Sequence, residues 1–304
     1  MSVTVVICTY KRPGVAARCA EAIVPQLGPE DSCLVVAQGD DAEYEETRGA
    51  IGRKFKEPVR SLRIIHQREP SRTEARNRGL VEAETAYVAY LDDDCVARPG
   101  WLAELLVPLR EGRADLVAGR LVEDPDLTTN APRRTGAVIT STGHTRRNFN
   151  TPRSGPSGLA PGGNMAVRRE LALRVGGFDT GIWRGTATYE DSEFSERLRR
   201  AGARIWYNGE AVVDHLAVRS GSWWTGDLSS QEAERARHMS LIFRRHRPWR
   251  WPLMAKAYIL AALFKVVRGR LPYRAVRMVA AGLIEGRGDG AREMRPLSER
   301  TESV

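Results

Sequence analysis

"YLDDDCVARPGW" (residues 90–101) ends a hydrophobic run in three consecutive carboxylates, Asp92, Asp93 and Asp94. Like charges this close repel one another, so their presence in one turn needs a physical reason. One explanation is a solvated turn, since Asp is common in turns. The other is a bound cation, because hard divalent ions such as Mg²⁺ and Mn²⁺ prefer oxygen ligands. The stretch raises two hypotheses that only its surroundings can separate.

Short apolar runs rich in β-branched residues lead up to these aspartates, at residues 3–8, 33–37, 62–65 and 86–91. Helix-like or loop-like segments separate the runs, and this alternation predicts a largely parallel sheet covered by helices on both faces. In an open α/β sheet, ligands bind outside the carboxyl ends of the strands. The aspartates follow the fourth run directly, so we expect them at a ligand site.

Helix start signals accompany the predicted strands. Ser71 stands three residues before Glu74, which is the spacing of a capping box. Pro99 fits the first position of a later helix. That helix would turn four leucines to one face, namely Leu102, Leu105, Leu106 and Leu109.

The segment from 122 to 162 differs from the rest, because it is rich in Pro, Gly, Ser, Thr and Asn. A loop region of this length inside a compact domain is usually functional or mobile, so we expect a lid or a ligand-binding loop here. Beyond it, the stretch 189–207 predicts a helix with Phe194 and Leu198 on one face, which leads into a strand near 205–207.

Composition limits the class of protein. With 304 residues, 42% of them hydrophobic and 28% charged, the chain can bury an ordinary core, as one large α/β domain with an appendage or as two modest domains. The four cysteines form no CxxC pair and have no histidine at zinc-ligand spacing, which argues against a disulfide scaffold and a structural zinc site. A reducing compartment fits best, and no secretory signal is visible, so we expect a cytoplasmic protein.

The positive charge is concentrated in the last third of the chain. Residues 1–215 hold 30 Lys and Arg against 30 Asp and Glu, whereas residues 216–304 hold 17 against 8. From about residue 230 the pattern is helical. Lys256 and Lys265 break its apolar run, which makes the run too short and too charged for a transmembrane span.

Two interpretations of this basic segment stay open. Its aromatic and cationic residues suit an interfacial helix on an anionic membrane leaflet, with the aromatic rings at headgroup level. The same segment could instead form a helical cap that packs on the preceding domain and leaves its arginines in water. The residues concerned are Trp249, Trp251, Tyr258, Arg244, Arg245, Arg247, Arg250 and Lys256.

The common phosphate-binding loops are missing from the sequence. No GxxxxGK[ST] motif occurs, and no GxGxxG follows a predicted strand. A phosphate-bearing ligand would then need a metal ion and cationic side chains. Arg76, with Asn77 beside it, could supply a charge-assisted contact from the capped helix. The alternative is that Arg76 lies on a solvated helix face.

Five motifs, in this order and at these spacings, resemble family 2 glycosyltransferases of the GT-A fold. They are "VVICTYKRP" (5–13), "ARNRG" (75–79), "YVAYLDDDCVARPGWL" (87–102), "GGNMAVRRELALRVGGFD" (162–179) and "YEDSEFSERLRRAG" (189–202). The resemblance covers residues 2 to 216. It implies an α/β fold of GT-A type, in which a Rossmann-like, mostly parallel sheet is flanked by helices.

The resemblance also implies a division of the chain. Residues 1–216 would form the catalytic domain, with a nucleotide-binding half at 1–120 and an acceptor half at 121–216. Residues 217–304 would form a basic, helical C-terminal extension.

Donor-binding roles follow from the same resemblance. Thr9, Tyr10 and Arg12 match the segment that holds the donor nucleotide. Asp92 and Asp93 belong to the DxD-type motif and are expected near the ribose and the diphosphate.

The metal, the base and the acceptor contacts are implied in the same way. Asp94 matches the direct metal ligand, and His215 matches a histidine that joins the metal or the diphosphate in some members. Asp191 matches the catalytic base. The residues expected at the acceptor are Gly163, Asn164 and Glu190.

The chemistry of glycosyl transfer is consistent with these roles. A base must take the proton of the acceptor hydroxyl, and the charge of the diphosphate leaving group must be stabilised. One carboxylate cannot easily do both, and the clusters at 92–94 and 190–191 allow the two tasks to be divided. For Glu190 and Asp191 the alternative is an acidic first helical turn favoured by the helix dipole. For His215 the alternative is a core or surface histidine.

One departure from the family pattern concerns the nucleotide base. Where many members have an acidic residue after the second strand, this chain has Ala37 and Gln38. Gln38 can both donate and accept hydrogen bonds, so it could still bind a uracil-like edge. The identity of the donor nucleotide is left open.

We therefore expect a metal-dependent, inverting glycosyltransferase that uses Mg²⁺ or Mn²⁺ and moves a sugar from a nucleoside-diphosphate sugar to a hydroxyl of a glycan, a lipid-linked acceptor or a small molecule. The alternatives are a nucleotidyltransferase, or an inactive GT-A-like domain that binds membrane or nucleic acid. We expect no nucleic-acid partner, because residues 1–215 are electrically neutral. The expected location is the cytoplasm, on the inner face of the membrane if the basic segment is interfacial.

Overall fold

The alternating pattern produces a mixed sheet in the computed structural model, which describes residues 1–122, 134–181, 189–218 and 227–286 together with Leu297. Within these residues the sheet has nine strands, in the order β3–β2–β1–β4–β10–β6–β11–β5, with β9 paired to β11, while β7 and β8 form a separate hairpin. The strands are β1 (Val3–Tyr10), β2 (Ser32–Gln38), β3 (Leu62–Gln67), β4 (Tyr87–Asp92), β5 (Cys95–Ala97), β6 (Leu116–Val122), β7 (Gly136–Ile139), β8 (Thr145–Asn148), β9 (Gly155–Pro156), β10 (Asn164–Arg168) and β11 (Ile205–His215).

Strands β1 to β4 are parallel to one another, as the apolar runs predict. The other part of the sheet is mixed, because β10 runs antiparallel to both β4 and β6, whereas β6 and β11 are parallel. β1 pairs with β2 on one side and with β4 on the other, so the strand order reverses at β1. A reversal of this kind leaves a ligand-binding crevice outside the carboxyl ends of the two strands beside it.

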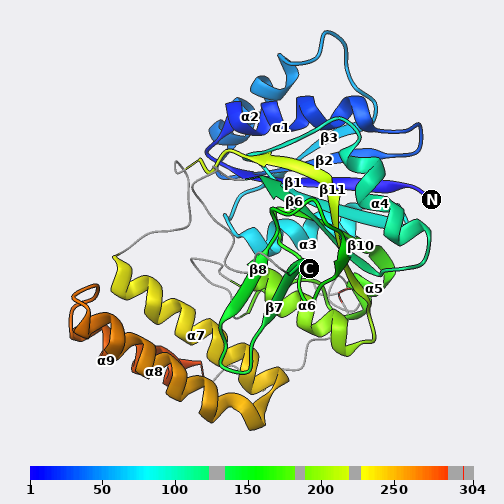
Figure 1. Ribbon diagram of the computed structural model, residues 1–304. Helices are drawn as coiled ribbons and strands as arrows, with labels where there is room; N and C mark the ends of the chain where they lie inside the picture. Colours follow the sequence, from blue (N-terminus) through cyan, green and yellow to red (C-terminus); the bar gives the residue numbers. More distant parts are fainter. Residues whose placement is uncertain (123–133, 182–188, 219–226, 287–296, 298–304) are drawn as a thin grey trace.

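Helices cover both faces of the sheet (Figure 1). Buried residues of α1, α2 and α4 pack on one face, and those of α3, α5 and α6 pack on the other. The helices are α1 (Pro13–Ile23), α2 (Asp41–Gly52), α3 (Arg72–Glu82), α4 (Trp101–Arg110), α5 (Arg169–Arg174), α6 (Glu190–Arg200), α7 (Leu228–His246), α8 (Trp251–Val267) and α9 (Arg274–Glu285), with short 3₁₀ turns η1 (Val24–Gln26) and η2 (Pro248–Arg250).

The helix start signals are confirmed in one case and wrong in the other. The Ser71 hydroxyl accepts a hydrogen bond from the Glu74 N–H at 3.4 Å, so α3 begins where the sequence predicts. Pro99 does not open the next helix. Instead, α4 starts at Trp101, and its N-cap is Gly100 in a left-handed conformation with φ of 83°. Glycine has no side chain and adopts that conformation at little cost. The left-handed turn at Gly100 therefore makes α4 begin two residues after Pro99. The predicted leucine face of α4 is buried, as expected.

Helices α7, α8 and α9 pack against one another and against the β7–β8 hairpin through a third cluster of buried residues (Figure 1). The helical character predicted for the C-terminal segment is therefore confirmed. Within the described ranges, none of the helices combines the length and the apolar character that spanning a membrane requires.

The basic end of α7 is anchored to buried carboxylates. Arg245 Nη1 lies 2.9 Å from Glu193 Oε1 and 2.8 Å from Asp179 Oδ2. Arg247 pairs with Glu196, which is also buried. Two of the arginines that the sequence offers to a membrane surface, Arg245 and Arg247, thus face α6 and hold the helical extension on the sheet.

We predict that Glu193→Gln lowers the free energy of unfolding by about 3–5 kcal/mol, because it leaves the Arg197 guanidinium without its buried counter-charge and leaves Arg245 with Asp179 alone. Urea denaturation at neutral pH measures the change. Glu45→Gln removes the exposed partner of Arg48 and is the matched control, with an expected cost below about 1 kcal/mol. Equal effects in the two variants would contradict the anchoring role.

The pH dependence of this difference is a second check. Burial raises the pKa of Glu193, but the charges of Arg197 and His246 outweigh it and hold the pKa far below its ordinary value of 4.5. The stabilisation from the ionised Glu193 is complete above the ordinary pKa of 4.5. It is lost as the pH falls through the lower pKa of the folded state. The stability difference between the wild type and Glu193→Gln should therefore shrink in acid below about pH 4.5, whereas a constant difference would rule out an ionised Glu193.

Candidate active site

The three aspartates after β4 have different partners. Asp93 Oδ2 accepts a hydrogen bond from the Thr9 hydroxyl at 2.7 Å, and its Oδ1 lies 3.0 Å from Arg12 Nη1. The same Arg12 nitrogen lies 3.4 Å from Asp94 Oδ2. Burial raises the pKa of Asp93 to about 6, although Arg12 and Thr9 oppose the rise. The ends of β1 and β4 thus meet in one charged cluster, as their parallel pairing requires.

Asp94 also approaches a histidine of the neighbouring strand. His215 is paired in register with Cys95, and its Nε2 lies 3.4 Å from Asp94 Oδ1. One ligand atom each from Asp94, Cys95 and His215 falls within 4.8 Å of the others. Burial raises the pKa of the Cys95 thiol well above its ordinary value. A soft sulfur ligand also suits Mg²⁺ or Mn²⁺ less well than oxygen or nitrogen ligands do. The carboxylate and the imidazole that remain fit a hard or borderline divalent cation.

A buried arginine links the first aspartate to the start of α6. Arg76 Nη2 lies 3.0 Å from Asp92 Oδ1, and Arg76 Nη1 lies 2.8 Å from Glu190 Oε1. Burial raises the pKa of Asp92, but Arg76 and Arg72 outweigh it and the pKa is lowered. Burial and the charge of Asp191 raise the pKa of Glu190 against the effect of Arg76. Arg76 is buried, so the alternative of a solvated helix face is wrong. Its contact with a phosphate of the donor stays a prediction.

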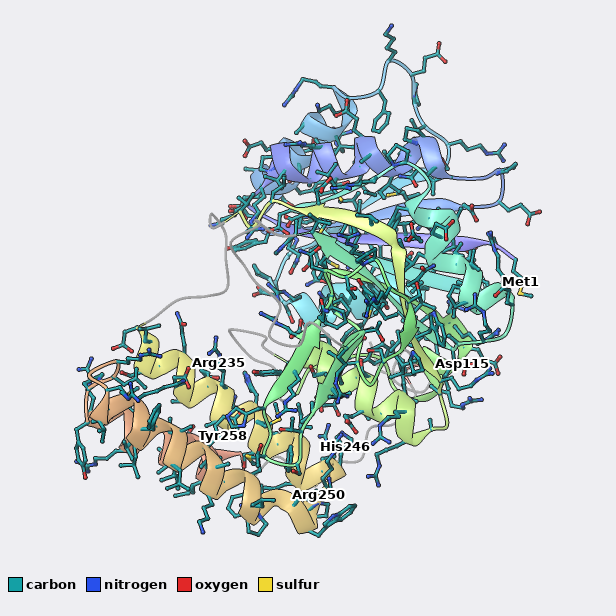
Figure 2. The ribbon with its side chains drawn as sticks, viewed as in Figure 1. Met1, Asp115, Arg235, His246, Arg250 and Tyr258 are labelled. Atoms are coloured by element: carbon teal, nitrogen blue, oxygen red, sulfur yellow. The ribbon has the colours of Figure 1, made fainter. Side chains whose placement is uncertain are left out.

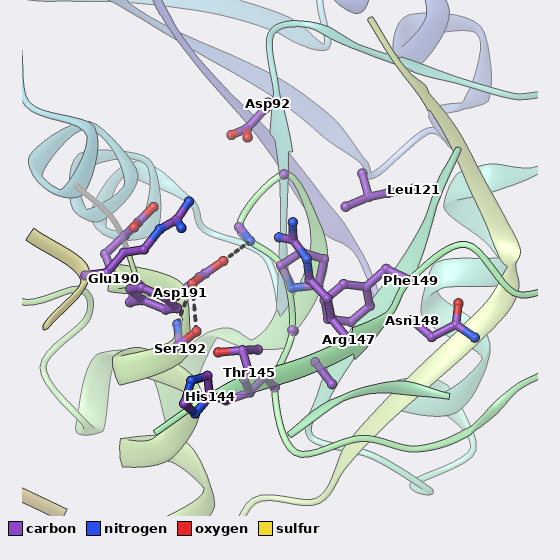
Figure 3. Close-up of a pocket in the computed structure, with 18 of the residues that line it drawn as sticks. Asp92, Leu121, His144, Thr145, Arg147, Asn148, Phe149, Glu190, Asp191 and Ser192 are labelled. Atoms are coloured by element: carbon purple, nitrogen blue, oxygen red, sulfur yellow. Dashed lines mark hydrogen bonds between the residues drawn. The ribbon is translucent and has the colours of Figure 1, made fainter. Parts of the chain in front are cut away.

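Asp191 is held in a different direction from Glu190. Its Oδ2 accepts a hydrogen bond from the Gly162 N–H at 3.0 Å. Its Oδ1 accepts from the Ser192 N–H at 2.6 Å and from the Ser192 hydroxyl at 3.2 Å (Figure 3). Tyr189, just before α6, has φ of 68°, and this turn starts the helix with Glu190 facing the core and Asp191 facing the Gly162 loop.

A cavity of about 750 Å³ runs from the end of β4 to the C-terminal helices (Figure 3). Asp92, Asp191 and His215 line one end. The other end is lined by His144 and Arg147 of the β7–β8 hairpin, Tyr189 before α6, Arg235 of α7, and Tyr258 and Lys265 of α8. The volume lies in the range that holds a small-molecule ligand. The helical extension is therefore part of the cavity wall.

Two adjacent glycines form the floor of the cavity. A Cβ atom on Gly162 would lie 2.4 Å from Arg76 Nη2, and one on Gly163 would lie 2.7 Å from Asp92 Oδ2. Contacts this short do not occur for real side chains, so both positions require glycine for the chain to pass over the Arg76 pair. Gly163 lines the cavity, and its predicted contact with the acceptor stays a prediction.

Gln38 and Asn77, predicted to contact the donor, hold backbone groups instead. Gln38 Oε1 accepts a hydrogen bond from the Ser71 N–H at 2.8 Å, and its Nε2 donates to the Thr9 carbonyl at 3.4 Å. Asn77 donates to the Phe178 carbonyl and accepts from the Phe178 N–H, each at 2.7 Å. Both amides connect segments around the site, and direct ligand contact by either stays a prediction.

Asn164 belongs to the core. It is fully buried, accepts a hydrogen bond from Trp101 Nε1 at 2.9 Å and donates to the Arg120 carbonyl at 3.0 Å. Its position gives no support to the predicted acceptor contact. Tyr10 is half-buried at the end of β1, with the Lys11 ammonium group 5.2 Å from its ring centre.

The residues at the far end of the cavity could not be recognised from the sequence. The loop-rich segment contains a hairpin, and the part of it at 123–133 lies outside the described residues. The sequence signal for this hairpin is the glycine at its turn, between the stretches 136–139 and 145–148. Gly143 adopts φ of 77° there, a conformation that favours glycine. Nothing local in the sequence indicates that Arg147 and Arg235 line the same cavity.

Comparisons with known proteins identify the family of the chain. The family model described as Glycosyl transferase family 2 matches residues 4–176. A glucosyl-dolichyl phosphate glucuronosyltransferase of Haloferax volcanii is 26% identical over 254 residues, which is 80% of this chain and 79% of that protein. A pre-mycofactocin glycosyltransferase of Mycobacterium tuberculosis is 32% identical over 157 residues, which is 52% of this chain and 32% of that protein.

Solved structures are similar in fold. The mannosyltransferase PcManGT of Pyrobaculum calidifontis, in complex with GDP-Man and Mn²⁺, superimposes with a TM-score of 0.57 at 21% identity, over 95% of this chain and 86% of that one. TarS 1–349 of S. aureus gives a TM-score of 0.57 at 14% identity, over 94% and 89%. The predicted GT-A fold is confirmed. Because the family match covers more than half of the sequence, the chain belongs to glycosyl transferase family 2 and is a glycosyltransferase.

Proposed function

We propose that this glycosyltransferase is metal-dependent and inverting, and that it transfers a sugar from a nucleoside-diphosphate sugar to an acceptor hydroxyl. The observation that carries the proposal is the separation of two carboxylates. Asp94 lies beside His215 at the strand ends, whereas Asp191 is fixed by backbone donors in the cavity wall. One acidic group is thus available for a cation and another for a proton.

Asp94 and His215 are the residues we assign to a Mg²⁺ or Mn²⁺ ion. Bound there, the ion would neutralise charge that develops on the diphosphate leaving group. The Mn²⁺ in the similar mannosyltransferase structure supports a divalent metal. Arg12, at 3.4 Å from Asp94, adds a permanent positive charge on the same side of the site. We assign donor binding to the strand ends in residues 1–120.

Asp191 is the proposed general base. An ionised carboxylate has about four acceptor positions. In Asp191 the hydrogen bonds described above use one position on Oδ2 and two on Oδ1, so Oδ2 keeps one for the acceptor hydroxyl. As the acceptor oxygen bonds to the anomeric carbon, its proton passes to Asp191. The bond from that carbon to the diphosphate oxygen breaks, and the nucleoside diphosphate leaves. Attack from the side opposite the leaving group inverts the configuration.

A lipid-linked acceptor is the class that we favour. The similar glucuronosyltransferase is named for a sugar linked to dolichyl phosphate. The far end of the cavity carries Arg147, Arg235 and Lys265 against one carboxylate, Glu232, which pairs with two of these cations. A net positive wall suits an anionic group on the acceptor. Such an acceptor would bring the enzyme to a membrane surface.

We predict that Asp191→Asn lowers the rate of nucleoside diphosphate release about a hundredfold or more, because an amide cannot accept the proton. The assay uses a panel of UDP-, GDP- and dTDP-sugars with a membrane extract as the source of acceptor. Ser192→Ala is the control, since it removes one hydrogen bond to Asp191 and should cost less than about tenfold. A wild-type rate in Asp191→Asn would exclude this residue as the base.

We predict that Asp94→Asn and His215→Gln each weaken Mn²⁺ binding at least about tenfold, since even residues that only support metal ligands change affinity by that much. Titration followed by electron paramagnetic resonance of the free ion measures binding without turnover. Asp214→Asn is the matched control, because this neighbour pairs with Arg98 at the surface, at 2.6 Å. Unchanged affinity in all three variants would place the metal elsewhere, and activity that survives EDTA would end the proposal of metal dependence.

A further inference from the structure

Helix α8 has an outer face that the fold leaves exposed. Its apolar residues recur every three or four positions, so they share one side of the helix. Their exposed fractions run from 37% for Leu263 to 83% for Val267. Trp249, just before the helix, is 72% exposed. We define the outer α8 face as Trp249, Leu253, Leu260, Leu263, Phe264 and Val267.

The opposite side of α8 belongs to the protein interior and to the cavity. Met254 and Ala262 are buried among the C-terminal helices. Tyr258 and Lys265 line the cavity, and the Tyr258 hydroxyl donates a hydrogen bond to the Gly143 carbonyl of the hairpin at 3.2 Å. One helix therefore separates the outer face from the proposed acceptor site, a thickness of about 10 Å.

Positive charge surrounds the outer α8 face. Residues 235–284 contain 12 Lys and Arg and no Asp or Glu. Four of these cations pair inward with Glu193, Glu196 or Glu232, namely Arg235, Arg245, Arg247 and Lys265. Arg250, Lys256, Arg268 and Arg270 are exposed next to the apolar residues, and the Arg268 guanidinium lies 5.1 Å from the Phe264 ring centre. In Figure 2, Arg250 lies at the edge of the helical extension, away from the sheet.

This combination favours one kind of occupant. Contiguous exposed apolar groups on a water-soluble surface mark an interaction site. A second copy of the chain would bring the same cations against these cations, which repel. An anionic bilayer accepts the apolar side chains at the level of its headgroups and attracts the cations beside them.

We propose that the outer α8 face docks in the plane of a bilayer that contains anionic lipid. Docking would hold the cavity one helix diameter from the headgroups and present a lipid-borne hydroxyl to Asp191. The last step rests on the proposed function, whereas docking itself depends only on the surface of α8.

Flotation of the intact protein with phosphatidylcholine vesicles, with and without phosphatidylglycerol, tests the docking. The wild type should bind the anionic vesicles, and added salt should weaken the binding. Leu260→Gln and Phe264→Gln should each lower the partition coefficient roughly tenfold, since each removes an apolar side chain from the bilayer. Lys256→Gln and Arg268→Gln should each lower it about fivefold. Val81→Gln and Arg68→Gln, at exposed sites near α3, are the matched controls and should bind like the wild type.

Three results would overturn the proposal: no binding to anionic vesicles, equal binding by the wild type and the α8 variants, or a dimer in sedimentation velocity that Phe264→Gln dissociates without any vesicle binding. Nucleoside diphosphate release measured on the same variants separates this proposal from the proposed function. The α8 variants should keep their activity toward donor in detergent solution, and Asp191→Asn should keep its vesicle binding. Failure of one property with retention of the other identifies which proposal is wrong.

Discussion

A buried guanidinium holds the two sides of the active site together. Arg76 is 2% exposed, yet it stays protonated because arginine keeps its charge in any protein environment. It joins Asp92 at the end of β4 to Glu190 at the start of α6, and its guanidinium lies 5.3 Å from the Phe178 ring centre. Since Asp191 follows Glu190 directly, the ion pair that fixes one carboxylate also sets the direction of the next.

The three consecutive aspartates coexist because each has a positive or hydrogen-bonding partner, and Asp93 and Asp94 share Arg12. Asp92 has Arg76, Asp93 has Arg12 and the Thr9 hydroxyl, and Asp94 has Arg12 and His215. Neither a solvated turn nor a cation alone explains the cluster, since the protein supplies part of the compensating charge itself. The lowered pKa of Asp92 and the raised pKa of Asp93 show that neighbours of one residue type differ through these contacts.

Local patterns predicted the parts of the fold that depend on local physics. Alternating apolar runs gave β1 to β4, and a cap spacing gave the start of α3. The antiparallel entry of β10 between β4 and β6 follows from tertiary packing, which no single segment encodes. For the site, the family resemblance implied a metal role for Asp94 and His215 and a separate role for Asp191. The roles of Asn164 and Gln38 could not be predicted, because an amide in a motif looks the same whether it faces a ligand or a backbone group.

The far wall of the cavity could not be predicted either, because it joins three segments that are distant in the sequence. Pairing reduces the net charge of this wall, because Glu232 contacts both Arg235 and Lys265. Elsewhere in the basic segment, Arg247 turns inward to Glu196. Net charge of the basic segment therefore overstates what reaches the surface.

The glycine floor has a consequence for how the specificity of this enzyme can change. At Gly162 and Gly163 the space beside the Arg76–Asp92 pair is bounded by bare backbone, and any added carbon atom meets a charged group of that pair. A substitution at either glycine would therefore disturb the ion pair and not merely narrow the cavity. Variation in what the cavity accepts is confined to the opposite wall, where the hairpin and α8 contribute side chains whose size can change without disturbing the ion pairs beneath.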